Sequence, residues 1–221
     1  MEYKKDLEEV ISVLFFNLWQ ASNLLKIANT INESMEVFDG QPLVLPIDTS
    51  DAPPQVPRII LKNKDESIRL EISLEKAVLV ISKDIEGKLK FSNELIGCLI
   101  HIIYDEFQWE VNRLAKVSTY KLMLENNSIE YIQEKYLKDD VIKRPEQLNL
   151  HWLKKILYNE DTLNHWVKIS TPEGYENKEF KLTVDINMVQ DNDRIVDDEL
   201  AISFFKDIDE RIEESFIEVV S

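Results

Sequence analysis

Residues 57–82 read PRIILKNKDESIRLEISLEKAVLVIS, and this stretch decides the fold class of the chain. Its middle part, 68–75, alternates apolar with polar residues, and this period of two places one face of a strand on a core and the other face in water. Shorter apolar runs at 58–62 and 77–81 flank it, and the polar residues 63–66 are typical of a turn. Because parallel neighbours need a long crossover, strands joined this closely are antiparallel. The stretch therefore predicts a three-stranded antiparallel meander.

The N-terminal part of the chain carries apolar residues at three- and four-residue steps between 4 and 32, which predicts a long helix. Its middle part, 13–19, is apolar on nearly all sides, so we expect it to be buried in the sheet core or against a second copy of the chain. Polar residues interrupt the run, which is too short to cross a membrane. The residues expected at an oligomer interface are Leu14, Phe15, Leu18 and Trp19.

Further patterns complete the expected architecture. Additional strands are predicted at 111–124, 148–152, 162–170 and 180–188, and further helices at 92–107, 128–137 and 198–219. This order predicts an α+β fold: an antiparallel sheet with helices packed on one face and a long N-terminal helix. We expect three parts, namely an N-terminal helix (1–34), a proline-containing linker or edge segment (35–56) and a single α+β domain (57–221).

The composition argues against several classes of function. The chain of 221 residues has 42 acidic and 26 basic residues, and its net charge of −16 repels nucleic acid and anionic membranes. Its 4 glycines argue against nucleotide-binding loops, which need several glycines at fixed spacing. A single cysteine, Cys98, leaves no disulfide and no cysteine-based zinc site. Without a signal-peptide pattern or a long apolar run, a cytoplasmic, soluble protein without a cofactor is expected.

Three groups of residues suggest chemistry, and each also has an ordinary structural interpretation. Cys98, His101 and Asp105 share a helix face, which suits either a thiol nucleophile with an imidazole or the shoulder of an amphipathic helix. His151 and His165 lie near carboxylates and could bind a metal, but each adjoins a tryptophan, as partly buried strand residues do.

The third group is the acidic segment 191–199, which resembles a calcium loop superficially. It lacks the glycine and the final glutamate that such a loop requires. We therefore expect a solvated loop in which Asp197 and Asp198 stabilise the start of the last helix.

Acidic residues concentrate in the last helix. Asp207, Glu210, Glu214 and Glu218 follow one another at three- and four-residue steps, so they form a row on one side. Like charges at this spacing repel one another. A row that is present despite this repulsion favours a role in binding a basic partner. The leading hypothesis is therefore a non-enzymatic, acidic protein-binding protein, such as an inhibitor, an immunity protein, an antitoxin or a holding chaperone.

Two other classes of function stay open at this point. One is an enzyme that uses Cys98 and His101, or a metal held by His151 and His165. The other is a structural subunit of a larger assembly, docked through the N-terminal helix. A homo-oligomer is a further alternative.

Overall fold

The computed structural model describes residues 3–19, 23–45, 52–82, 85–137, 145–174, 176–191 and 193–221. The elements, in chain order, are β1 (Tyr3–Phe16), α1 (Leu24–Met35), β2 (Leu43–Val44), β3 (Ile59–Lys62), β4 (Ile68–Ile72), β5 (Lys76–Ile81), α2 (Lys88–His101), the π-helical turn η1 (Ile102–Phe107), β6 (Val111–Leu124), α3 (Ser128–Tyr136), β7 (Asn149–Tyr158), β8 (Asp161–Ser170), β9 (Glu179–Met188) and α4 (Asp198–Val220). The strands of these ranges form one antiparallel sheet in the order β2-β3-β4-β5-β1-β6-β9-β8-β7. The predicted α+β fold with an antiparallel sheet is confirmed.

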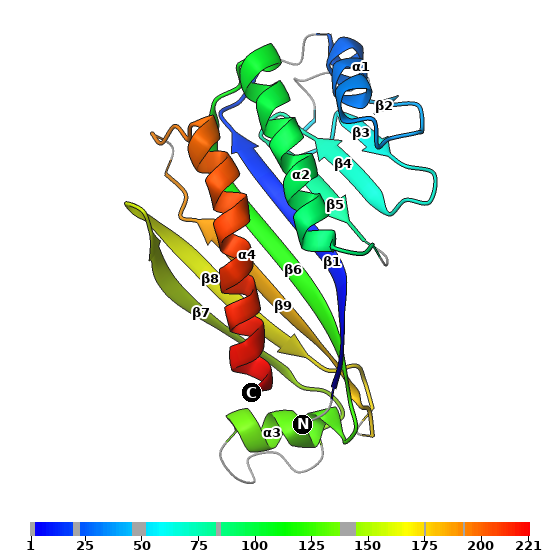
Figure 1. Cartoon of the computed structure of the whole chain (residues 1–221), viewed down its shortest axis with the longest axis vertical. Helices are drawn as coiled ribbons and strands as arrows, with labels where there is room; N and C mark the ends of the chain where they lie inside the picture. The colour runs from blue at the N-terminus through cyan, green and yellow to red at the C-terminus, as the bar shows by residue number, and fades with distance from the viewer. Residues whose placement is uncertain are drawn as a thin grey trace.

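The molecule has two layers, because the described helices lie on one side of the sheet (Figure 1). Helices α2 and α4 cross the sheet side by side, α1 packs on α2 and β3, and α3 lies beneath the C-terminal end of α4. The face of the sheet opposite these helices is called the open face below. The core lies between the layers, and its buried residues include Leu70, Ile72, Leu99, Ile103, Phe180, Leu182, Val184, Ile186, Phe205 and Ile208.

The long helix expected at the N-terminus is wrong. Residues 3–16 form β1, the middle strand of the sheet, where Ile11 is aligned with Val80 of β5 and Val117 of β6. The first helix, α1, is 12 residues long and begins only at Leu24. The run at 10–16 also places apolar residues, among them Ile11 and Phe15, on the open face, and a continuous apolar run cannot be told from a buried helix by periodicity. Residues 1–34 are therefore not a separate helical unit, since their strand holds the two halves of the sheet together.

The ends of the other helices show local capping. The side chains of Asn127 and Asp197 accept hydrogen bonds from backbone N–H groups in the first turns of α3 and α4, as expected for N-caps. Helix α2 begins four residues before the expected Ser92, after Gly87 in a left-handed conformation (φ 66°). Ser92 is instead buried in α2, where its hydroxyl lies 3.2 Å from that of Ser12 in β1.

A search of the described helices finds none that is both long and apolar enough to cross a membrane.

Candidate protein-binding surfaces

The acidic row predicted on α4 is exposed along its length. Its two ends are held by β7, because the Tyr158 hydroxyl donates a hydrogen bond to Asp207 (2.9 Å) and the Lys154 ammonium donates one to Glu218 (2.8 Å). The row therefore runs alongside β7, the last strand of the sheet. Between these contacts, Glu210 and Glu214 have no ion pair or hydrogen bond from their side chains to any described residue.

Two other acids of α4 face the sheet and serve the fold. The carboxylate of Glu213 accepts hydrogen bonds from the Tyr120 hydroxyl (2.9 Å) and from the Lys5 ammonium (2.7 Å). Asp209 pairs with Lys116, which is fully buried between the layers. The negative charge of α4 is thus divided between internal partners and the exposed row.

Lys116 is a residue that the sequence did not single out. Its ammonium donates hydrogen bonds to Asp209, to the side-chain oxygen of Asn93 (2.6 Å) and to the carbonyl of Phe205 (3.2 Å). Burial lowers the pKa of Lys116, and the charge of Asp209 opposes that shift. The alternation of the strand was the signal in the sequence. Leu114, Lys116 and Ser118 occupy every second position of β6, and all three face inward.

Cys98 and His101 line an apolar groove between α2 and α4, together with Ile202. Nothing in the described chain activates the thiol, because the Cys98 sulfur makes only a 3.8 Å contact with the carbonyl of Ser34, and burial raises the pKa of Cys98. A nucleophile needs the opposite shift. The helix also changes to a π-helical turn after His101, which alters the spacing to Asp105.

His151 and His165 cannot share a metal ion, because adjacent strands place them on opposite faces of the sheet. The His165 ring faces α4, where its Nε2 atom lies 2.8 Å from the Ser215 hydroxyl, and burial lowers the pKa of His165. His151 lies on the open face beside Trp166, with 6.4 Å between the ring centres. Among the described residues, no three or more His, Cys, Asp or Glu side chains cluster in a way suited to a metal.

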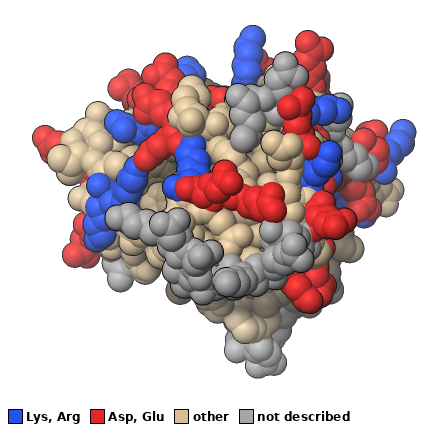
Figure 2. All heavy atoms as spheres, turned by 90° about the horizontal axis from the view of Figure 1, so that it is seen from below, with Lys and Arg blue, Asp and Glu red and all other residues tan. Residues whose placement is uncertain are grey.

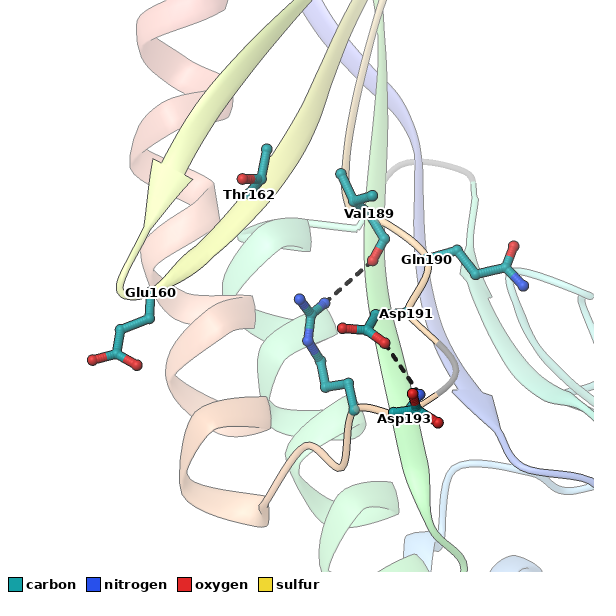
Figure 3. Close-up of a pocket in the computed structure, with 7 residues that line it drawn as sticks. Glu160, Thr162, Val189, Gln190, Asp191 and Asp193 are labelled. Carbon is teal, nitrogen blue, oxygen red and sulfur yellow. Dashed lines mark hydrogen bonds between the residues drawn. The ribbon is translucent and has the colours of Figure 1, made fainter.

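The loop that resembles a calcium site forms one wall of a pocket beside the β7–β8 hairpin (Figure 3). The carboxylate of Asp191 accepts a hydrogen bond from the backbone N–H of Asp193 (3.1 Å), which is a turn contact. Arg194 donates to the carbonyl of Val189 (3.2 Å) and pairs with Asp161. Glu160 points away from the two aspartates (Figure 3). The Asp191 carboxylate is thus engaged in a turn, and the Arg194 guanidinium supplies the pocket's positive charge.

The four residues expected at an oligomer interface do not form one surface. Leu14 is fully buried beneath the helices. Phe15 lies on the open face, where the centre of its ring is 3.7 Å from the guanidinium carbon of Arg113. Leu18 is 69% exposed beyond the end of β1. Trp19 stacks on Trp109, with 4.3 Å between the ring centres, and donates a hydrogen bond from its indole N–H to the carbonyl of Ser73. Leu14 and Phe15 diverge because successive side chains of a strand point to opposite faces, whereas Leu18 and Trp19 follow the end of β1.

β7 carries apolar side chains that no described part of the chain covers well. Leu157 is 74% exposed, Leu153 is 41% exposed, and Trp166, which pairs with Leu153 across the hairpin, is 39% exposed. All three lie on the open face. Exposed leucines on an edge strand are an unusual feature, because edges are normally blunted by charge or covered.

Comparisons with known proteins leave the family open. No family model and no curated protein matches the chain. Two solved structures have a loosely similar arrangement. The rolling circle replication initiator protein from Geobacillus stearothermophilus is 8% identical, with a TM-score of 0.35 over 93% of this chain and 80% of that one. TBP from Methanococcus jannaschii is 12% identical, with a TM-score of 0.29 over 97% of this chain and 99% of that one. Likenesses this weak carry no argument about function.

Proposed function

We propose that this chain is a non-enzymatic protein-binding protein that recognises a basic surface through the acidic row of α4. The observation that carries the proposal is the pair Glu210 and Glu214, which are exposed and unpaired among the described residues. Their neighbours in the row, Asp207 and Glu218, are held by β7. Inhibitors, immunity proteins, antitoxins and holding chaperones all fit this mode of recognition.

The helix that bears the row is rigidly placed, which favours binding. Its opposite side is fixed in the core by buried aromatic and aliphatic residues, among them Phe204, Phe205, Ile208, Ile212 and Phe216. The backbone of a fixed helix loses little conformational freedom when a partner binds, so only the carboxylate side chains have to be ordered. Two like charges four residues apart repel by a few tenths of a kcal/mol, and a cation between them removes that repulsion.

The end of the molecule at which α3 lies suits this role less well than the length of α4. Seen from the end at which α3 lies, acidic and basic side chains are interspersed (Figure 2). A surface of mixed sign attracts no partner at long range, whereas a row of one sign raises the association rate.

The first prediction tests the row with the double substitution Glu210→Gln and Glu214→Gln. An ion pair between exposed groups contributes up to about 1 kcal/mol. Removing two exposed charges should therefore weaken binding of an octalysine probe by roughly tenfold at low salt. Fluorescence anisotropy measures this affinity. The effect should fade near 1 M salt, where the Debye length is about 3 Å.

The matched control is the double substitution Asp105→Asn and Glu106→Gln. It changes the net charge by the same amount at two exposed positions of η1, outside the acidic row. The control should bind octalysine about as tightly as the unchanged protein. If both double variants weaken binding equally, the row acts only through the net charge of the protein, and that result would contradict the proposal.

A further inference from the structure

The outer edge of β7 is free in the described part of the chain. This strand is 10 residues long, stands last in the sheet and pairs only with β8 there. A strand in this position presents a row of unpaired N–H and C=O groups that a further strand can match.

The hairpin geometry identifies the groups that point outward. Tyr158 pairs with Asp161 across the two-residue loop of Asn159 and Glu160, and in such a loop the closing pair is hydrogen-bonded inward. Because backbone groups alternate in direction along an antiparallel strand, the outward residues are His151, Leu153, Lys155 and Leu157.

A strand added at this edge would meet two different surfaces. On the helix side it would lie outside β7, along the flank of α4 whose row is held by β7 through Asp207 and Glu218 and carries Glu210 and Glu214 between them. Arg211 of α4 and Lys154 of β7 are the basic residues beside the four carboxylates of the row, so the flank stays negative. On the open face it would lie beside the exposed apolar side chains of β7. Side chains of an added strand alternate between these two environments.

We propose that the edge of β7 binds an extended segment of a partner protein in which basic residues alternate with apolar residues. The basic side chains would face the acidic row of α4, and the apolar ones would pack on Leu153 and Leu157. This inference rests on the proposed function, to which it adds the form of the partner. Strand addition supplies affinity through backbone hydrogen bonds and specificity through alternate side chains. A second copy of β7 fits less well, because it would bring Lys154 and Lys155 of both chains together.

The second prediction compares two synthetic peptides of equal composition, KVKVKVKV and KKKKVVVV, each blocked at both ends. Only the first can place all its lysines on one side of a strand and all its valines on the other. The alternating peptide should bind the full chain at least about tenfold more tightly in anisotropy titrations. Equal affinities would overturn strand addition.

A pair of substitutions at one position tests the backbone contact. Lys155→Pro removes an outward N–H, which edge strands tolerate, and Lys155→Ala removes only the side chain. The proline variant should bind the alternating peptide no better than the block peptide, while the alanine variant keeps the preference. If the two variants behave alike, the edge is not the binding site.

A measurement on the unchanged protein covers the case in which the proline variant does not fold. Hydrogen exchange of the Leu153 and Lys155 amides should slow when the alternating peptide binds and stay fast with the block peptide. Unchanged exchange, or sedimentation showing that pairs of chains form through β7 instead, would contradict the inference.

The failures of the two proposals are distinguishable. If the Glu210 and Glu214 double variant weakens both peptides equally and the unchanged protein does not discriminate between them, basic recognition stands and strand addition falls. If the double variant binds both peptides as tightly as the unchanged protein, the role of the row itself is wrong.

Discussion

At the scale of single residues, buried polar groups join the sheet to α4. Lys116 is completely inaccessible to solvent, and its ammonium is satisfied by a carboxylate, an amide oxygen and a backbone carbonyl. Removing a charge from water costs several kcal/mol, and only good partners offset that cost. Lys116 therefore depends on Asp209 for its place in the core.

The third prediction concerns this pair. Asp209→Ala leaves the Lys116 ammonium without its counter-charge and should lower the free energy of unfolding by about 3 kcal/mol. The double variant Lys116→Met and Asp209→Leu removes both charges and should be more stable than the single variant. Urea unfolding followed by circular dichroism measures both. A single variant as stable as the unchanged protein would show that the pair is not coupled to folding.

The fourth prediction concerns the pH dependence of His165. Burial lowers its pKa in the folded state, with further lowering by Lys154 and Arg211 and an opposing effect of Glu218. Because the unfolded chain binds a proton more readily, this group favours the folded state above the unfolded pKa of about 6.5, and that contribution is lost as the pH falls through the lower folded value.

Urea unfolding at several pH values between 7.5 and 5, compared with His165→Gln, isolates this group from the other titrating residues. The unchanged protein should lose more stability than the variant as the solution is acidified. Parallel curves for the two proteins would show that His165 keeps its ordinary pKa in the fold.

At the scale of elements, β1 decides whether the sheet exists. It is hydrogen-bonded to β5 on one side and to β6 on the other. Without it, the strands β2–β5 and β6–β9 would each end in a bare edge with an exposed apolar surface.

The fifth prediction is that a chain starting at Met35 does not fold. Loss of β1 and α1 removes Leu14, Ala28 and Ile31 from the core, all of them fully buried. Circular dichroism and sedimentation should show lost cooperativity and aggregation. A soluble, cooperatively unfolding shortened chain would mean that residues 57–221 form an independent domain after all.

The sequence predicts those elements whose patterns are local. The strands at 111–124, 162–170 and 180–188 match β6, β8 and β9 within one residue, because one face of each meets the helices. β1 is apolar on both faces, so its type follows from its place in the sheet, which depends on residues far away in the chain. The faces on which His151 and His165 lie follow from the pairing register of the hairpin. Once the turn at 159–160 is recognised, counting back from it along both strands places the two histidines on opposite faces.

The candidate site is predictable only in part, for a similar reason. Helical spacing is sufficient to find the acidic row on α4. Its alignment along β7 requires knowing that β7 is an edge strand and that Tyr158 and Lys154 reach the helix. Which carboxylates serve internal partners and which face solvent is likewise a property of the packed layers.

At the scale of the whole molecule, charge is sorted between the layers. The sheet supplies hydroxyls and ammonium groups, from Lys5, Lys116, Tyr120, Lys154 and Tyr158, and α4 supplies the carboxylates that receive them. Much of the acidity concentrated at the end of the sequence therefore stabilises the contact between layers, and Glu210 and Glu214 are the members of the exposed row left for other partners.

The central position of β1 has a consequence during translation. The ribosome makes this strand first, but its partner β5 begins only at Lys76, so at about 5–20 residues per second the strand stays unpaired for roughly 3–12 s. Residues 10–16, VISVLFF, contain no charge and no proline, the composition of segments that aggregate when exposed. The charged residues just before them, in KKDLEE, match the gatekeeper residues that flank such segments and oppose their aggregation.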